Sequence, residues 1–140
     1  MLILDTDHLV EYQKGTSPEA QRLKQRLDEV DEPFGTTIIT EEEVMRGWLA
    51  AIRRTPDPFR QINAYSKLRQ LFRAFATWDV LGWTSDSAAQ FKSLKAAKTR
   101  VGTMDLKIAS IALSSDATLL SHNLRNFQKV PGLRVADWLS

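Results

Sequence analysis

Hydrophobic residues recur along the chain in two alternating patterns, short continuous runs and longer stretches at helical spacing. The short runs are apolar or β-branched, which is typical of strands buried in a parallel sheet. They lie at Met1–Leu4, Thr36–Thr40, Trp78–Gly82, Ala117–Ser121 and Leu133–Val135. The stretches between them space apolar residues three or four positions apart, which predicts helices. Because strands and helices alternate, the pattern predicts a single α/β domain over residues 1–140, with a central parallel sheet of four to five short strands flanked by helices.

Capping residues predict where the first three helices begin and end. Asp7 is expected to cap a short helix that closes at Gly15, and Pro18 stands in the first turn of the next helix. Thr40 and Glu43 have the spacing of a capping box, so the third helix is expected to begin at Thr40.

Similar signals bound the remaining helices. Pro56 ends the third helix, and a long basic helix is expected over Phe59–Ala76. Ser85 or Asp86 is expected to cap the fifth helix, and Gly102 to precede the sixth. No repeat, linker or low-complexity segment interrupts this order, which favours one domain.

Composition restricts the chemistry that the chain can perform. Of its 140 residues, 43% are hydrophobic and 26% are charged, as in an ordinary packed domain. The chain has no Cys and two His, which excludes disulfides, Cys-type zinc sites and a thiol nucleophile. Any metal must therefore be bound mainly by oxygen. No apolar run is long enough to span a membrane and no signal sequence is evident, so we expect a cytoplasmic protein.

A basic segment runs from Arg46 to Arg73 and contains Asp57 as its sole acid. This balance favours an anionic partner such as nucleic acid. Arg46, Arg53 and Arg54 are the candidate RNA-binding residues, and the alternative is an ordinary solvated helix surface. Aromatic residues in the same segment are most often part of a core, although they also suit a groove for a partner helix or for the second copy in a homodimer.

Polar side chains follow the predicted strands or begin the helices after them, at Asp5, Glu43, Asp105 and Asn123. In open α/β sheets, ligands bind at the carboxyl ends of the strands. Several carboxylates gathered there are unfavourable unless a cation neutralises them. Asp5 is the strongest candidate because it follows a buried strand directly and is expected to cap no helix. Oxygen ligands suit Mg²⁺ or Mn²⁺, ions that activate water and stabilise charge on phosphate.

Four segments of the chain resemble a known family. They read LILDTDHL at residues 2–9, ITEEEVMRG at 39–47, VGTMDLKIASIAL at 101–113 and TLLSHNLRNFQKVPGLRVADW at 118–138. In this order and spacing the chain resembles the PIN-domain ribonucleases and, within them, the VapC-type toxins of bacterial toxin–antitoxin pairs. The resemblance implies a parallel sheet, divalent-metal-dependent endoribonuclease activity on RNA, and neutralisation by a small cognate antitoxin bound across the site.

The resemblance also implies roles for particular residues. It places the catalytic carboxylates at Asp5, Glu43 and Asp105, with Asp5 and Asp105 as ligands of Mg²⁺ or Mn²⁺. Glu42 is the alternative to Glu43. Asn123 stands where the family often has aspartate, and its amide oxygen can still hold a metal-bound water.

Three smaller side chains complete the expected site. Thr6 and Ser121 match small hydroxyl positions beside the metal, where they would orient water or phosphate. Asp7 is expected to support them. Asn126 replaces another frequent acid of the family.

Three alternative functions remain open at this point. The tripeptide Asp5–Asp7 is similar to the aspartate pair of haloacid-dehalogenase-type phosphatases, although Leu9 and the chain length fit that class badly. His8 and His122 could act as a metal-free acid and base, since imidazole titrates near neutrality. Asn123 is compatible with a decayed site in a module that only binds RNA or protein.

Overall fold

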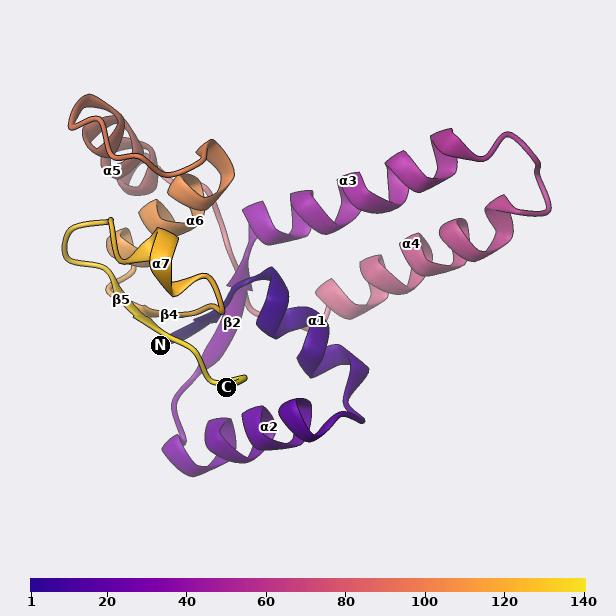
Figure 1. Cartoon of the computed structure of the whole chain (residues 1–140), viewed down its shortest axis with the longest axis horizontal. Helices are drawn as coiled ribbons and strands as arrows, with labels where there is room; N and C mark the ends of the chain where they lie inside the picture. Colours follow the sequence, from indigo (N-terminus) through magenta and orange to yellow (C-terminus); the bar gives the residue numbers. More distant parts are fainter.

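The computed structural model describes all 140 residues as five strands and seven helices (Figure 1). In chain order the elements are β1 (Leu2–Leu4), α1 (Thr6–Lys14), α2 (Pro18–Val30), β2 (Phe34–Thr37), α3 (Ile38–Arg54), α4 (Gln61–Phe75), β3 (Val80–Leu81), α5 (Ser85–Ala96), α6 (Thr103–Ser114), β4 (Thr118–Leu120), α7 (Leu124–Phe127) and β5 (Arg134–Ala136). None of these helices is both long and apolar enough to cross a membrane.

The five strands form one parallel sheet in the order β3-β2-β1-β4-β5. The central strand β1 pairs Leu2 with Phe34 of β2 on one side and with Thr118 of β4 on the other. All three residues of β1 are buried, because a parallel sheet is covered by helices on both faces. The predicted α/β class and parallel sheet are therefore confirmed.

Side chains of β1 alternate between two hydrophobic cores, as successive residues of a strand point to opposite faces. Ile3 belongs to a core that includes Ile108 of α6 and Phe127 of α7. Leu2 and Leu4 belong to the other core, which helices α1, α2 and α4 cover. The carboxyl end of the central strand is thus held rigidly between two packed layers.

Helices α3 and α4 form a long hairpin that extends from the body of the domain (Figure 1). Their inner ends join the core through Leu71 and Phe75 of α4. Further out, large apolar side chains are exposed, namely Leu49, Phe59, Ile62, Tyr65 and Phe72. Phe75 is therefore part of the core, whereas Tyr65 and Phe72 are exposed, which fits the alternative of a groove for a partner.

The predicted cap of the first helix is wrong. Asp5, not Asp7, is the N-cap of α1, and its carboxylate accepts a hydrogen bond from the Thr6 backbone N–H at 2.8 Å. Asp7 lies in the first turn. The strand ends one residue before Asp5, so the helix begins without a connecting loop, and Asp5 does have a helix to cap.

The capping box at Thr40 and Glu43 is also absent. Strand β2 ends at Thr37, and the hydroxyl of Thr37 caps α3 by accepting from the Thr40 backbone N–H at 3.1 Å. The β-branched run therefore divides into a strand and the first turn of a helix. Glu43 is consequently free of any capping role.

Three smaller boundary predictions also differ from the structure. Thr84 caps α5 in a reciprocal pair with Ser87, one residue before the predicted cap. Helix α4 begins at Gln61 instead of Phe59, and β5 extends to Ala136. The short helix α7 was not predicted.

Candidate active site

Acidic side chains converge at the carboxyl edge of the sheet. Asp5 follows β1, Glu43 lies in α3 after β2, and Asp105 lies in the first turn of α6. The charges of Asp5 and Asp105 both raise the pKa of Glu43. Such repulsion is appreciable only over short distances. The fold therefore brings together three acids that are distant in the sequence.

Asp5 is a buried carboxylate, with 7% of its surface exposed. Its Oδ1 accepts from the Thr6 backbone N–H, and its Oδ2 accepts from the Ser121 hydroxyl at 2.8 Å. The pKa of Asp5 is raised from 3.8 to about 6. Burial is the largest cause and the charges of Asp7 and Asp105 add to it, whereas the Ser121 hydrogen bond opposes it.

Glu43 is the second acid of the group with a raised pKa, which is shifted from 4.5 to about 7. Burial is the largest cause, followed by repulsion from Asp5, Asp105 and Glu42, while Arg46 opposes the shift. Its Oε1 is buried and has no hydrogen-bond partner. A buried acceptor without a protein partner is costly, so this atom is suited to a ligand that satisfies it.

Glu42, the alternative to Glu43, already has a salt-bridge partner. Its carboxylate pairs with the guanidinium of Arg46 at 2.5 Å, one helical turn further along α3. The pair leaves Glu43 as the glutamate directed toward the other acids. Arg46 therefore stands beside the site.

Asp105 is oriented by two asparagines of the segment after β4. Its Oδ2 accepts from Asn126 Nδ2 at 2.8 Å and from Asn123 Nδ2 at 3.4 Å. Asn123 is thus brought to the site, with its amide nitrogen toward Asp105. Asn126, which the sequence analysis noted as the replacement of a frequent acid, makes the shorter contact, and its contact with Asp105 was not predicted.

Asp7 and Ser121 tie the end of β4 to the start of α1. Ser121 Oγ donates to Asp5 and accepts from the Asn123 backbone N–H at 3.0 Å. Asp7 Oδ2 accepts from the His122 backbone N–H at 3.0 Å. These bonds fix the loop that carries Asn123 relative to Asp5.

His8 forms a hydrogen bond with Asp7 and is completely buried. Its Nε2 accepts from the Trp138 backbone N–H at 3.0 Å, so the proton lies on Nδ1, which donates to Asp7 Oδ1 at 2.6 Å. Both ring nitrogens are therefore occupied. His122 instead exposes its ring and bonds Asp137 Oδ2 at 2.7 Å. This arrangement does not suit the two histidines to metal-free acid–base catalysis.

Thr6 contributes a second unpartnered polar atom. Its hydroxyl oxygen, like Glu43 Oε1, is buried without a hydrogen-bond partner, and it lies directly beside Asp5 in the chain. Two such atoms at one edge of the sheet indicate that the site takes a polar ligand.

The donor set fits a divalent cation such as Mg²⁺. No three His, Asp or Glu side chains lie close enough, in their present conformations, to enclose an ion. Mg²⁺ does not require such a cage, since it usually keeps several waters and binds through one or two carboxylates. A cation would relieve the repulsion that raises the pKa values of Asp5 and Glu43.

The three candidate RNA-binding arginines lie at different distances from this site. Arg46 borders it through Glu42. Arg53 and Arg54 are exposed in the last turn of α3, at the far end of the hairpin (Figure 1). The structure therefore does not bring the last two together with the acids.

Comparison with known proteins identifies relatives in sequence. A family model described as PIN domain matches residues 2–133. A segment of 64 residues is 33% identical to the tRNA(fMet)-specific endonuclease VapC of Salmonella typhimurium. That segment covers 43% of this chain and 48% of the relative, so the match spans about half the relative's length.

Comparison of structures finds the same fold over nearly the whole chain. VapBC-1 from nontypeable Haemophilus influenzae matches with a TM-score of 0.74 and 21% identity, covering 99% of this chain and 98% of that one. VapBC2 from Rickettsia felis, bound to a DNA fragment from their promoter, matches with a TM-score of 0.72 and 18% identity, covering 98% of both chains. Because the sequence match to the family model covers almost all of the sheet and helices described above, the chain belongs to the PIN domain family.

Proposed function

We propose that this protein is a divalent-metal-dependent endoribonuclease and the toxin of a toxin–antitoxin pair. One observation supports this function above all, namely the unpartnered Glu43 Oε1 buried beside the charges of Asp5 and Asp105. A protein that used these acids only for stability would pair or disperse them. Family membership and the similarity to an endonuclease support the same function.

In this proposal Asp5 and Asp105 hold Mg²⁺ or Mn²⁺, with Glu43 completing the negative cluster. When bound, the ion would activate a water for attack on phosphorus and stabilise the charge that develops on the phosphate. Ser121 orients Asp5, and Asn126 and Asn123 orient Asp105, through the hydrogen bonds described above. No side chain forms a covalent bond to the RNA.

We further propose a small cognate antitoxin as the protein partner. The similar structures from H. influenzae and R. felis are named VapBC, and the fold they share with this chain supports a corresponding complex. A homodimer is also proposed, because Leu49, Phe59 and Ile62 expose apolar surface on the α3–α4 hairpin. Light scattering of the purified protein, alone and with the product of the adjacent gene, tests both partners.

RNA cleavage by the purified protein tests the nuclease function. We expect Mg²⁺ or Mn²⁺ to support cleavage, EDTA to abolish it, and Asp5→Asn to reduce it by about 100-fold or more, because the change removes a ligand and a charge. Glu19→Gln, on the distant helix α2, is the matched control. If Asp5→Asn cleaves RNA and inhibits growth like the unchanged protein, the proposed function is wrong.

A further inference from the structure

A cavity opens at the same edge of the sheet, beside the acids. It has a volume of about 560 Å³, within the range of roughly 300–1,000 Å³ typical of small-ligand pockets. Ile38 and Ile39 of α3 form its floor where β2 ends, and Trp83 follows the end of β3. Since β2 and β3 lie next to β1 in the sheet, this cavity continues the acidic site along one edge.

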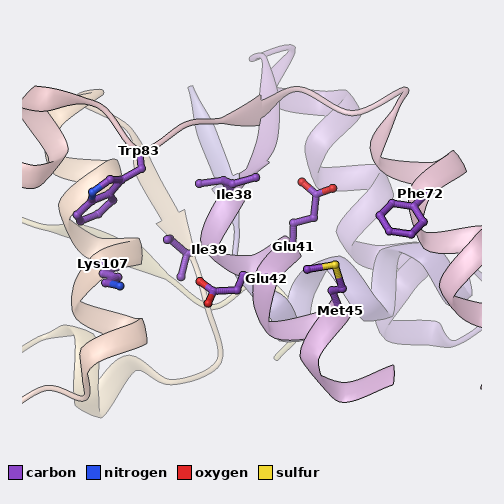
Figure 2. Close-up of a pocket in the computed structure, with 8 residues that line it drawn as sticks. All are labelled: Ile38, Ile39, Glu41, Glu42, Met45, Phe72, Trp83 and Lys107. Atoms are coloured by element: carbon purple, nitrogen blue, oxygen red, sulfur yellow. The ribbon is translucent and has the colours of Figure 1, made fainter. Parts of the chain in front are cut away.

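The two sides of the cavity each carry an aromatic ring (Figure 2). Trp83 and Lys107 lie on one side of the first turns of α3, and Met45 and Phe72 lie on the other. Trp83 keeps 40% of its surface exposed and Phe72 keeps 55%. Exposed aromatic faces beside a nucleic-acid cleavage site are suited to stacking on unpaired bases.

Trp83 is held in place although it is exposed. Phe91 of α5 packs against it in a T-shaped pair with ring centroids 5.7 Å apart. Lys107 Nζ lies over the ring at 5.8 Å from its centroid. A ring fixed in this way loses little conformational entropy when a base stacks on it.

Three charged side chains line the cavity, Glu41, Glu42 and Lys107, and Glu41 is the acid without a partner. Glu41 lines the cavity, and neither a hydrogen bond nor a charged neighbour acts on its carboxylate. Glu42, by contrast, is neutralised by Arg46. A free carboxylate repels phosphate but accepts hydrogen bonds from the N–H groups of a base.

We propose that this cavity binds unpaired nucleobases of the RNA substrate, with Trp83 and Phe72 as stacking surfaces and Glu41 as the acceptor for a base edge that carries N–H groups. Guanine is preferred over uracil, because its N1–H and exocyclic amine are adjacent donors that suit both carboxylate oxygens. The inference rests on the nuclease function proposed above. Lys107, which also lines the cavity, supplies a cation for the connecting phosphate.

The main alternative occupant is an apolar peptide segment of a protein partner. The side chains of such a segment offer the Glu41 carboxylate no hydrogen-bond donor, and a carboxylate buried without a donor costs about 1–3 kcal/mol or more. A base satisfies the carboxylate and the two rings together. The cavity chemistry therefore favours RNA.

Binding of short RNAs in EDTA tests the proposal independently of catalysis. The probes are fluorescein-labelled UUUUUU and UUGUUU, followed by fluorescence anisotropy. We expect the unchanged protein to bind UUGUUU about 10-fold more tightly, and Glu41→Gln to lose most of that preference. Trp83→Ala and Phe72→Ala should each weaken binding of UUGUUU by about 5- to 150-fold, the range for loss of one stacked base.

Controls separate the cavity from the fold and from the nuclease function. Tyr65→Ala removes a similarly exposed ring from α4 outside the cavity and should bind both RNAs normally. Trp83→Phe should restore most of the affinity lost in Trp83→Ala. For each variant, the ratio of its affinities for UUGUUU and UUUUUU does not depend on the fraction of that variant that is folded. Equal binding of both RNAs by the unchanged protein, or normal binding by Trp83→Ala and Phe72→Ala, overturns the cavity proposal. A lack of Mg²⁺-dependent cleavage overturns the nuclease function alone.

Discussion

At the scale of single residues, the site stores unfavourable electrostatic energy in its metal-free form. The pKa values of Asp5 and Glu43 are about 6 and about 7, whereas their ordinary values are 3.8 and 4.5. An acid with a higher pKa in the folded state binds its proton more tightly there, so protonation favours folding. Stability contributed in this way is complete below about pH 4 and is lost as the pH rises to about 7.

Glu43→Gln should therefore stabilise the metal-free protein at pH 7.5. We expect the melting temperature to rise by about 3–5 °C, which corresponds to ~1 kcal/mol after allowance for solvent screening. At pH 4 the same change should have little effect, because Glu43 is then protonated. Thermal unfolding in EDTA at both pH values measures this, and an equal effect at pH 4 and pH 7.5 would show that the carboxylate charge is not the cause.

Asn126 is predicted to act on catalysis through Asp105, whose Oδ2 it contacts at 2.8 Å. Asn126→Ala should lower cleavage activity by about 10- to 100-fold, as is typical of residues that orient a metal ligand. Excess Mg²⁺ should recover part of the activity, since a misoriented ligand weakens metal binding. Asn63→Ala, on the exposed face of α4, is the control. Full activity of Asn126→Ala at low Mg²⁺ would remove Asn126 from the site.

At the scale of elements, the contact between β2 and β3 depends on a glycine. A Cβ at Gly35 would come within 2.2 Å of the Asp79 backbone oxygen. That oxygen also accepts from the Thr36 backbone N–H at 2.9 Å, so it cannot move away freely. The edge strand β3 therefore lies too close to β2 for any residue larger than glycine at position 35.

Gly35→Ala should destabilise the protein by about 1–3 kcal/mol, the usual cost of overpacking. Gly47→Ala is the control, because no atom lies within 4 Å of a Cβ built at Gly47 on α3. Urea unfolding of the two variants measures the difference. A stability of Gly35→Ala equal to that of the unchanged protein would mean that β3 separates from β2 at no cost.

The strands and their parallel pairing could be predicted from sequence, whereas the N-caps of α1, α3 and α5 could not. The apolar run before Asp5 allowed only a buried strand. In Thr36–Thr40, however, Thr37 and Thr40 are both good caps, and choosing between them depends on how far β2 pairs with β3. Asp5 likewise becomes a cap only because α1 begins without a loop.

The three acids could be nominated from sequence because each follows a strand or begins a helix beside one. The family resemblance also nominated Ser121 and Asp7 as supports, but the hydrogen-bond partners that hold the supporting side chains could not be nominated, since these come from distant segments. His8 receives its hydrogen bond from Trp138, and Asp7 from His122. No local pattern indicates such contacts. The cavity with Trp83 and Phe72 was missed for the same reason, as its two sides come from different helices and a loop.

At the scale of the whole molecule, the acidic site and the arginines Arg53 and Arg54 lie near opposite ends of α3. A single-stranded RNA that reaches the acids could also contact Arg53 and Arg54 if it follows the hairpin. Each phosphate contact to a single strand adds about 0.7 to the slope of log affinity against log salt. The salt dependence of binding therefore reports whether the hairpin takes part.

Reversing Arg53 and Arg54 to Glu should weaken RNA binding and reduce that slope by about 1.4, the amount for two phosphate contacts. Arg22→Glu on α2 is the matched charge reversal away from the hairpin. Affinity measured between low and moderate salt gives both slopes. An unchanged slope in the Arg53 and Arg54 variant would exclude the end of the hairpin from the RNA path.

We propose above all that Asp5, Glu43 and Asp105 together form one divalent-metal site at the edge of the sheet. Titration with Mn²⁺, followed by electron paramagnetic resonance, measures this directly, because bound and free Mn²⁺ give different signals. We predict one site per chain that Mg²⁺ displaces, strongly weakened in Asp5→Asn and in Asp105→Asn and unaffected in Glu19→Gln. Equal Mn²⁺ binding by all four proteins would contradict the account.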